Sequence, residues 1–120
     1  MHFREDFLHF LWRWRRFDAL DLRTTEGQPV EVLQPGEHNT HAGPDFFDAR
    51  IRIGDTTWAG NVEMHLLASE WLAHGHSADR AYDNVVLHVV LEEDQPIHRA
   101  SGERLACVEM KERIPQGILA

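Results

Sequence analysis

The amino-acid sequence predicts an α/β fold in which helices flank a mixed β-sheet. Three observations predict the α/β class: helically spaced apolar residues near the N-terminus, several strand-like segments in the middle, and a doubly apolar segment at 84–92 that suits a central strand. The chain has 120 residues, 42% of them hydrophobic, enough for one modest core. We therefore expect a single domain over residues 1–120.

The first half of the chain predicts a helix followed by a strand meander. Residues 4–17 (REDFLHFLWRWRRF) place apolar side chains at near-helical spacing between charges, which indicates an amphipathic helix. Residues 20–36 predict two short strands around a Glu-Gly-Gln-Pro turn. Residues 45–53 and 56–67 flank the pair Gly54-Asp55, which is a strong hairpin signal.

The second half predicts a helix, a central strand and a last strand. Ser69 is a candidate N-cap for a helix over residues 70–82, which Gly75 weakens in the middle. Residues 84–92 (NVVLHVVLE) are apolar on both faces, as expected for a strand covered on both sides. Residues 105–110 predict a final strand before a charged tail.

Composition limits the location and the partners of the protein. The formal net charge of −8 argues against broad, nonspecific nucleic-acid binding, although residues 1–16 carry four arginines against two acids. Cys107 is the single cysteine, which excludes an intrachain disulfide and suits a reducing compartment. No apolar run approaches the roughly 20 residues that a membrane-spanning helix needs. We expect a soluble, cytoplasmic protein without a membrane partner.

Strand parity brings chemically active side chains together. Successive side chains of a strand alternate between faces, so Glu63 and His65 are neighbours that point the same way. Asp45 follows Gly43-Pro44 at the start of the paired strand, where a bend can turn its carboxylate toward the same face. Buried carboxylates need a cation or hydrogen-bond donors. We therefore expect Asp45, Glu63 and His65 to converge in one shallow cleft.

Two acids and a basic group on adjacent strands suit metal-assisted phosphodiester hydrolysis, in which carboxylates hold Mg²⁺ or Mn²⁺. The arrangement resembles the PD-(D/E)xK nuclease superfamily, with Pro44-Asp45 as the first half of its motif and Glu63-Met64-His65 in place of Glu-x-Lys. The resemblance implies that Asp45 and Glu63 are catalytic metal ligands and that His65 takes the lysine position. It also implies a restriction-endonuclease-like core and a further acid on the first helix, either Glu5 or Asp6.

His65 departs from that motif, because lysine is cationic at neutral pH whereas histidine is largely neutral unless carboxylates raise its pKa. His65 could equally be a third metal ligand. A purely structural alternative also stands, in which Asp45 caps a turn while Glu63 and His65 occupy a solvated strand face.

A second resemblance covers nearly the whole chain. The segments EDFLHFLW, PGEHNTHAGPDFFDARIRIG, WAGNVEMHLLASEW and AYDNVVLHVVLE resemble the N-terminal part of a bacterial family named domain of unknown function 2851. That family implies no established activity. Its members run well beyond 120 residues, so the resemblance implies that this domain is the N-terminal portion of a longer architecture or an unusually short member.

Further polar residues are candidates for the same site. His74, His76 and Asp79 lie within six positions, a spacing that suggests metal ligation, contact with substrate phosphate, or simple capping and solvation. Asn39 either bonds the turn backbone or contacts substrate from the loop before Asp45. His88, in the middle of an apolar strand, is expected to be a buried histidine with a hydrogen-bond partner rather than a ligand.

Trp12 and Trp14 lie two residues apart on the predicted helix and therefore point in different directions, which leaves one exposed or covered by a partner. Base stacking, core packing and a homodimer interface explain them equally well. Three functions remain: a nuclease-like domain dependent on Mg²⁺ or Mn²⁺, a nonenzymatic nucleic-acid or protein-binding module that retains the sheet, and a His/carboxylate metalloenzyme that acts on a small molecule through His65, His74 and His76.

Overall fold

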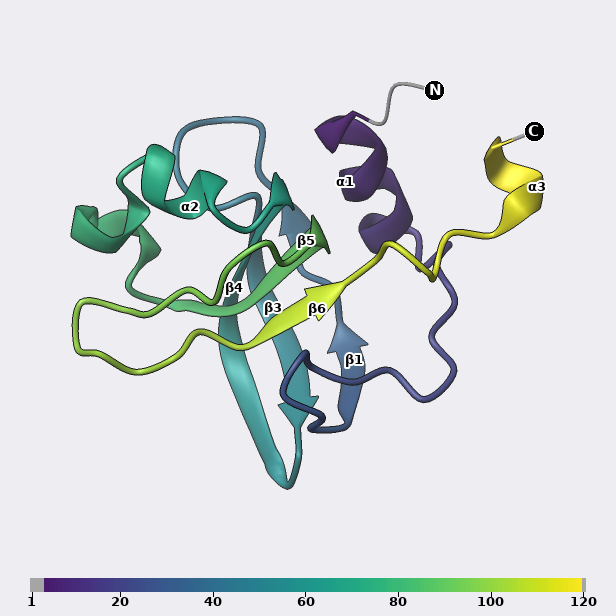
Figure 1. Ribbon diagram of the computed structural model, residues 1–120, viewed down its shortest axis with the longest axis horizontal. Coiled ribbons are helices and arrows are strands. Elements are labelled where there is room, and N and C mark those ends of the chain that lie inside the picture. The colour runs from purple at the N-terminus through teal and green to yellow at the C-terminus, as the bar shows by residue number, and fades with distance from the viewer. Residues whose placement is uncertain (1–3, 120) are drawn as a thin grey trace.

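The computed structural model describes residues 4–119, which form a mixed sheet with helices on both faces (Figure 1). The α/β fold class with a mixed sheet is thereby confirmed. In this part of the chain the sheet has the strand order β1-β3-β4-β5-β6, and β2 pairs with β3 off this path. The elements in chain order are α1 (Glu5–Arg13), β1 (Val30–Gln34), β2 (Glu37–His38), β3 (Phe46–Ile53), β4 (Thr56–Leu67), α2 (Glu70–Ala73), the 3₁₀ turns η1 (His76–Ala78) and η2 (Arg80–Tyr82), β5 (Val85–Glu92), β6 (Cys107–Glu109) and α3 (Gln116–Leu119).

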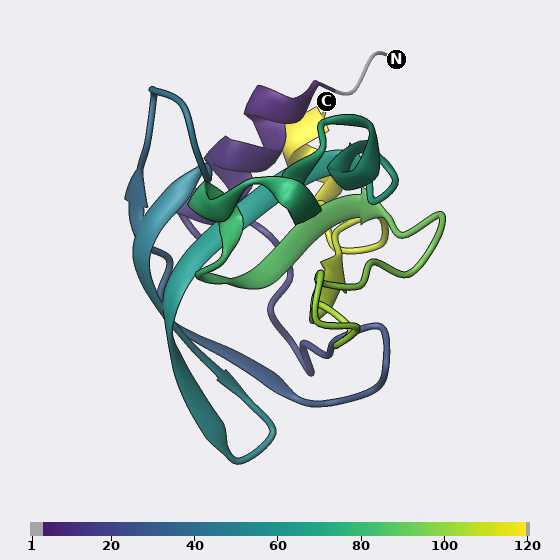
Figure 2. The ribbon, with the colours of Figure 1, turned by 90° about the vertical axis from the view of Figure 1, so that its left-hand side faces the viewer.

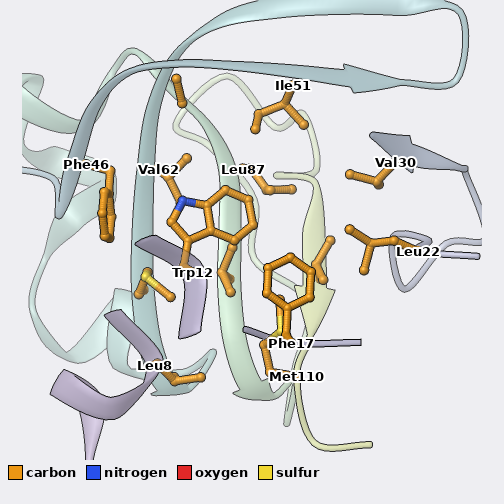
Figure 3. Close-up of a cluster of buried hydrophobic side chains, with 14 of the residues drawn as sticks. Leu8, Trp12, Phe17, Leu22, Val30, Phe46, Ile51, Val62, Leu87 and Met110 are labelled. Atoms are coloured by element: carbon orange, nitrogen blue, oxygen red, sulfur yellow. The ribbon is translucent and has the colours of Figure 1, made fainter. Parts of the chain in front are cut away.

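Helix α1 is anchored by one of its two tryptophans. Trp12 is fully buried in the main core, where its ring stacks on Phe17 with 5.9 Å between centroids (Figure 3). The indole Nε1 of Trp12 donates a hydrogen bond of 2.9 Å to the carbonyl oxygen of Pro35, so the burial leaves no polar atom of this ring unsatisfied. Trp14 is 58% exposed. The two rings therefore point in different directions, as their spacing predicts.

The hairpin of β3 and β4 confirms the turn signal in the sequence. Ile53 pairs with Thr56 across the two-residue loop Gly54-Asp55, and Gly54 has a φ of 61°, which a side chain would disfavour. Strand β4 then connects through α2 to β5, which pairs with it in parallel, and β6 continues the sheet in parallel with β5. Strand β5 is buried on both faces along most of its length, as expected for an inner strand.

Two local predictions are wrong, and a third is confirmed in its position alone. The segment before β1 contributes an isolated bridge from Arg23 to Pro29 instead of a second strand. The helix expected over residues 70–82 ends at Ala73, because Gly75 adopts a left-handed φ of 69° and the chain continues as η1 and η2. Ser69 occupies the N-cap position, but its side chain makes no capping hydrogen bond.

The two faces of the sheet have different cores. Leu8 and Trp12 of α1 pack with Val62 and Met64 of β4 on one face. Trp71 of α2 belongs to a second cluster on the other face, so α1 and α2 cover opposite sides (Figure 2). None of the helices in residues 4–119 combines the length and hydropathy that crossing a membrane would need.

Candidate metal centre

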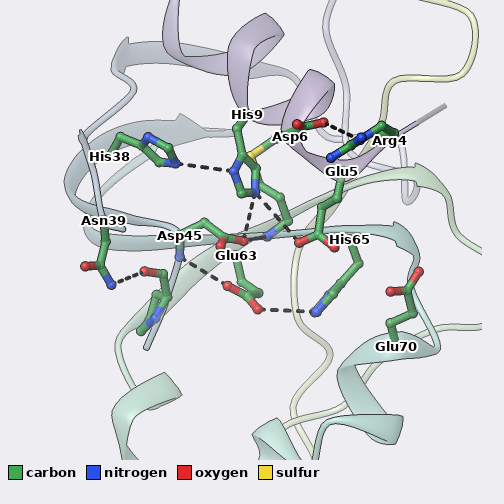
Figure 4. A network of polar contacts seen from close by, with 12 residues as sticks. Arg4, Glu5, Asp6, His9, His38, Asn39, Asp45, Glu63, His65 and Glu70 are labelled. Carbon is green, nitrogen blue, oxygen red and sulfur yellow. Dashed lines mark hydrogen bonds and ion pairs between the residues drawn. The ribbon is translucent and has the colours of Figure 1, made fainter. Parts of the chain in front are cut away.

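Asp45 and Glu63 meet where β3 and β4 pair, since Phe46 lies opposite Val62 in the ladder. The backbone N–H of Asp45 donates to Glu63 Oε1 at 3.2 Å, and the backbone N–H of Met64 donates to Asp45 Oδ2 at 2.8 Å (Figure 4). The carboxylate of Glu63 thus accepts from the backbone of Asp45, and the carboxylate of Asp45 accepts from the backbone of Met64, next to Glu63. The bend before β3 brings Asp45 to Glu63, as strand parity and the Gly-Pro pair predict.

Helix α1 adds a third acid and a histidine. His9 Nε2 lies 3.5 Å from Asp45 Oδ2 and 3.7 Å from Glu5 Oε1 (Figure 4). Glu5, His9 and Asp45 each offer a ligand atom, and these atoms lie within 4.8 Å of one another. Asp6 instead pairs with Arg4 at 3.4 Å. Of the two acids expected from the first helix, Glu5 is therefore the one that lies near Asp45. We refer to Glu5, Asp45 and Glu63, with His9 beside them, as the centre.

The carboxylates of this centre are electrostatically coupled. Burial and the nearby charge of Asp45 both raise the pKa of Glu63 far above its usual range. Burial alone would raise the pKa of Asp45 as well, but hydrogen bonds with His9 and Glu63 lower it. Burial alone would lower the pKa of His9, but Asp45 and Glu5 outweigh it and raise this pKa to about 9. These shifts favour the protonated form of Glu63, the anionic form of Asp45 and the cationic form of His9.

His65 lies beside Glu63 but carries no charge. Its Nε2 is 3.3 Å from Glu63 Oε2 (Figure 4). Its Nδ1 is 2.8 Å from Nε2 of His88. Burial and the neighbouring His76 lower the pKa of His65 to about 3. The contact with the protonated Glu63 is thus between neutral groups, and the cationic group of the centre is His9. His88 is fully buried with His65 as its partner, as its place in an apolar strand predicts.

The three candidate residues after α2 separate into different environments. His76 is buried, with Nε2 2.9 Å from Glu63 Oε2, whereas His74 is exposed but still within reach of His65. Asp79 accepts a hydrogen bond from the backbone N–H of Ala81 and caps η2. Asp79 therefore has the capping role, whereas His76 contacts Glu63 and His74 lies against His65.

Asn39 holds the loop that leads to Asp45. Its side-chain nitrogen donates to the carbonyl oxygens of His41, Ala42 and Pro44, at 3.3, 3.0 and 2.9 Å. Its side-chain oxygen accepts from the backbone N–H of His41. The amide is thus engaged by the turn backbone, which is the structural role considered for it, rather than turned toward a substrate.

Access to the centre differs between its residues. The side chains of Glu63 and His65 are only 6% and 2% exposed. The prediction of a shallow cleft is therefore wrong for these two residues, which form a buried contact. The side chains of Asp45 and Glu5 are 19% and 37% exposed, which opens the centre to solvent on the α1 side. His9 was not among the predicted site residues, although Glu5 and His9 are four residues apart on one helix and therefore share a face.

Comparison with known proteins identifies the family of this chain. Neither a curated protein nor a solved structure matches the chain. The profile of a protein family matches residues 5–120, which is nearly the whole chain and includes every residue of the centre. The chain therefore belongs to the family described as "Protein of unknown function (DUF2851)".

Proposed function

We propose that this chain is a divalent-metal-dependent, nuclease-like domain that hydrolyses phosphodiester bonds of nucleic acids. The observation that carries the proposal is the meeting of Asp45 and Glu63 at the pairing of β3 and β4, with a ligand atom of Glu5 of α1 within 4.8 Å of one of Asp45. Carboxylates from α1, from the bend before β3 and from β4 supply the oxygen ligands that Mg²⁺ and Mn²⁺ prefer.

The order of the elements supports the proposal. Helix α1 precedes the antiparallel strands β1, β3 and β4, and a helical crossover then leads to the parallel strand β5. This order is similar to the core of the PD-(D/E)xK nuclease superfamily, in which the two halves of the motif lie on adjacent strands. Asp45, immediately before β3, and Glu63 within β4 occupy the corresponding places.

The charges of the centre fit a cation. Two nearby carboxylates in a buried environment cannot both be ionised unless a positive charge compensates them, and here Glu63 retains its proton in the absence of a metal. Asp45, Glu63 and Glu5 would hold Mg²⁺ or Mn²⁺, which when bound supplies an activated water and stabilises charge on the phosphate. The exposed Glu5 side of the centre is where the phosphate would approach.

In this proposal the positive charge that lysine provides in the superfamily comes from His9, while His65 stays neutral and contacts Glu63. His9 pairs with both Asp45 and Glu5. His65 orients the glutamate from the buried side.

Substitution of His65 by lysine tests this assignment. We expect His65→Lys to lower metal-dependent cleavage by about tenfold or more, because the ammonium group would be buried beside His76 and His88 and the contact with Glu63 would change. Initial cleavage rates under saturating Mn²⁺ measure the effect, and His98→Lys, at an exposed position, is the control. Preserved or raised activity would instead give His65 the lysine role.

The proposal itself is tested by cleavage of nucleic acid. Single-stranded, duplex and branched DNA and RNA are incubated with the protein and Mn²⁺ or Mg²⁺, with and without a chelator. We expect cleavage of at least one substrate that the chelator stops and that Asp45→Asn reduces about 100-fold, which corresponds to several kcal/mol of lost charge stabilisation. Absence of chelator-sensitive cleavage on every substrate would refute the proposal and favour a nonenzymatic binding module.

A further inference from the structure

We propose that His65, His74 and His76, together with Oε2 of Glu63, form a second metal site, which takes Zn²⁺ or a transition-metal ion of similar ligand preference. The three imidazole rings form a nearly equilateral triangle. Their centroids are 5.2 Å apart for His65 and His74, 5.2 Å for His65 and His76, and 5.4 Å for His74 and His76. Three converging imidazoles are a common donor set for zinc.

The donor atoms lie close enough to share one ion. One nitrogen from each of the three histidines lies within 4.8 Å of the others. Two nitrogens bound to the same Zn²⁺ are at most about 4.2 Å apart, because each bond is about 2.1 Å long. Rotation of the exposed His74 side chain is enough to close this difference. Glu63 Oε2 completes the set, at 2.9 Å from His76 Nε2 and 3.3 Å from His65 Nε2.

His76 supplies an independent indication that a ligand belongs here. Its residue is 7% exposed, and its Nε2 has no hydrogen-bond partner among the described residues despite its distance of 2.9 Å from the carboxylate of Glu63. The ring is fixed by its stacking on Tyr82, at 3.7 Å between centroids. A buried nitrogen that faces an acceptor at short distance without a hydrogen bond is costly, and a shared metal ion removes that cost.

His65 is oriented in the way that metal-binding histidines commonly are. Its Nδ1 is held at 2.8 Å by Nε2 of His88, which leaves Nε2 to face Glu63 and the other two rings. Such a contact to the second ring nitrogen fixes the tautomer and the direction of a ligating imidazole. His88 itself is fully buried behind the site and is a positioning residue in this arrangement.

The imidazole-rich site differs in chemistry from the oxygen-rich centre of Glu5, Asp45 and Glu63. Imidazole favours Zn²⁺, Ni²⁺ or Fe²⁺, whereas carboxylates favour Mg²⁺ or Mn²⁺. Glu63 connects the two, since Oε1 faces the backbone of Asp45 and Oε2 faces the histidines. The zinc proposal does not require the nuclease function, because it rests on three histidines that are not ligands of the first centre.

Zinc titration tests the site directly. The protein is freed of metal with a chelator and titrated with Zn²⁺ by calorimetry, and Co²⁺ is used in parallel because its visible absorption reports nitrogen coordination. We expect one Zn²⁺ per chain and an affinity that falls by about tenfold or more in His74→Ala and in His76→Gln. His98→Ala removes an exposed histidine elsewhere and should leave the affinity unchanged.

His74 is the decisive position because it is exposed and its replacement should not disturb folding, which thermal unfolding of the metal-free variant checks. Absence of Zn²⁺ binding by the unmodified protein, or equal affinity in a folded His74→Ala variant, would overturn the proposal. Failure of the first centre would appear differently, as Mn²⁺ binding that Asp45→Asn leaves intact. The two proposals can therefore fail separately.

Discussion

Replacing Glu63 with glutamine is expected to stabilise the metal-free protein by about 2 kcal/mol more at pH 8 than at pH 4, while it abolishes Mn²⁺ binding. Glu63 is buried beside Asp45, and burial together with the charge of Asp45 raises its pKa from the ordinary value of 4.5. At pH 8 Glu63 is ionised in the unfolded chain. In the folded chain its ionisation is unfavourable, which lowers the free energy of unfolding at this pH. Glutamine has no proton to lose and avoids this cost.

The sign of the effect follows from the direction of the shift. A group whose pKa is raised on folding contributes stability that is present below its unfolded pKa and lost as the pH rises toward the folded pKa. The Glu63 contribution therefore falls as the pH increases from about 4.5. Urea unfolding in the presence of chelator at pH 4, 6 and 8 measures it, with Glu103→Gln as an exposed control. An advantage of Glu63→Gln that does not grow with pH would contradict the coupling to Asp45.

Replacing Trp12 with alanine is expected to lower the free energy of unfolding by about 3–5 kcal/mol, the usual cost of removing a large aromatic ring from a core. Trp12 is fully buried, and it attaches α1 to the sheet through Phe17 and the carbonyl oxygen of Pro35. The same helix carries Glu5 and His9. Loss of this anchor should therefore weaken Mn²⁺ binding as well, in any fraction of the variant that folds.

Trp12→Phe separates the two contributions of the tryptophan. It keeps an aromatic ring in the core but removes the Nε1 donor, which leaves the carbonyl of Pro35 without this partner. Its cost should be clearly smaller than that of Trp12→Ala, and Trp14→Ala, at the exposed ring, should cost less than about 0.5 kcal/mol. Chemical denaturation compares the three variants. Equal costs for Trp12→Ala and Trp14→Ala would contradict the orientation of α1.

The parts of the fold that local rules govern could be predicted from the sequence. The Gly54-Asp55 pair sets the turn of β3 and β4, and the two-residue period of a strand places Glu63 and His65 on one face. The meeting of Asp45 with Glu63 follows from that pairing. The helix after β4 was predicted too long, because the left-handed conformation of Gly75 ends it earlier than helix propensity alone indicates.

The charge state of the centre could not be predicted, because it depends on contacts between distant segments. A histidine beside an ionised carboxylate is expected to be cationic. Glu63, however, shares its site with Asp45, which favours its protonated form, and His76 and His88 lie against the ring of His65. The positive charge belongs to His9, which comes from α1 and reaches Asp45 only in the folded chain. In the sequence, only the four-residue spacing of Glu5 and His9 on one helix indicated that His9 lies beside an acid.

Calorimetric titration of Mn²⁺ tests the central claim, that Asp45 and Glu63 with Glu5 form a divalent-cation centre. Asp45→Asn removes an anionic ligand of this centre, retains the side-chain shape, and lies outside the histidine triangle. Mn²⁺ should bind the unmodified protein and bind Asp45→Asn at least about 100-fold more weakly, since each carboxylate contributes strongly to holding a hard cation. His98→Ala should bind like the unmodified protein. Undiminished Mn²⁺ affinity in a folded Asp45→Asn variant would contradict the account.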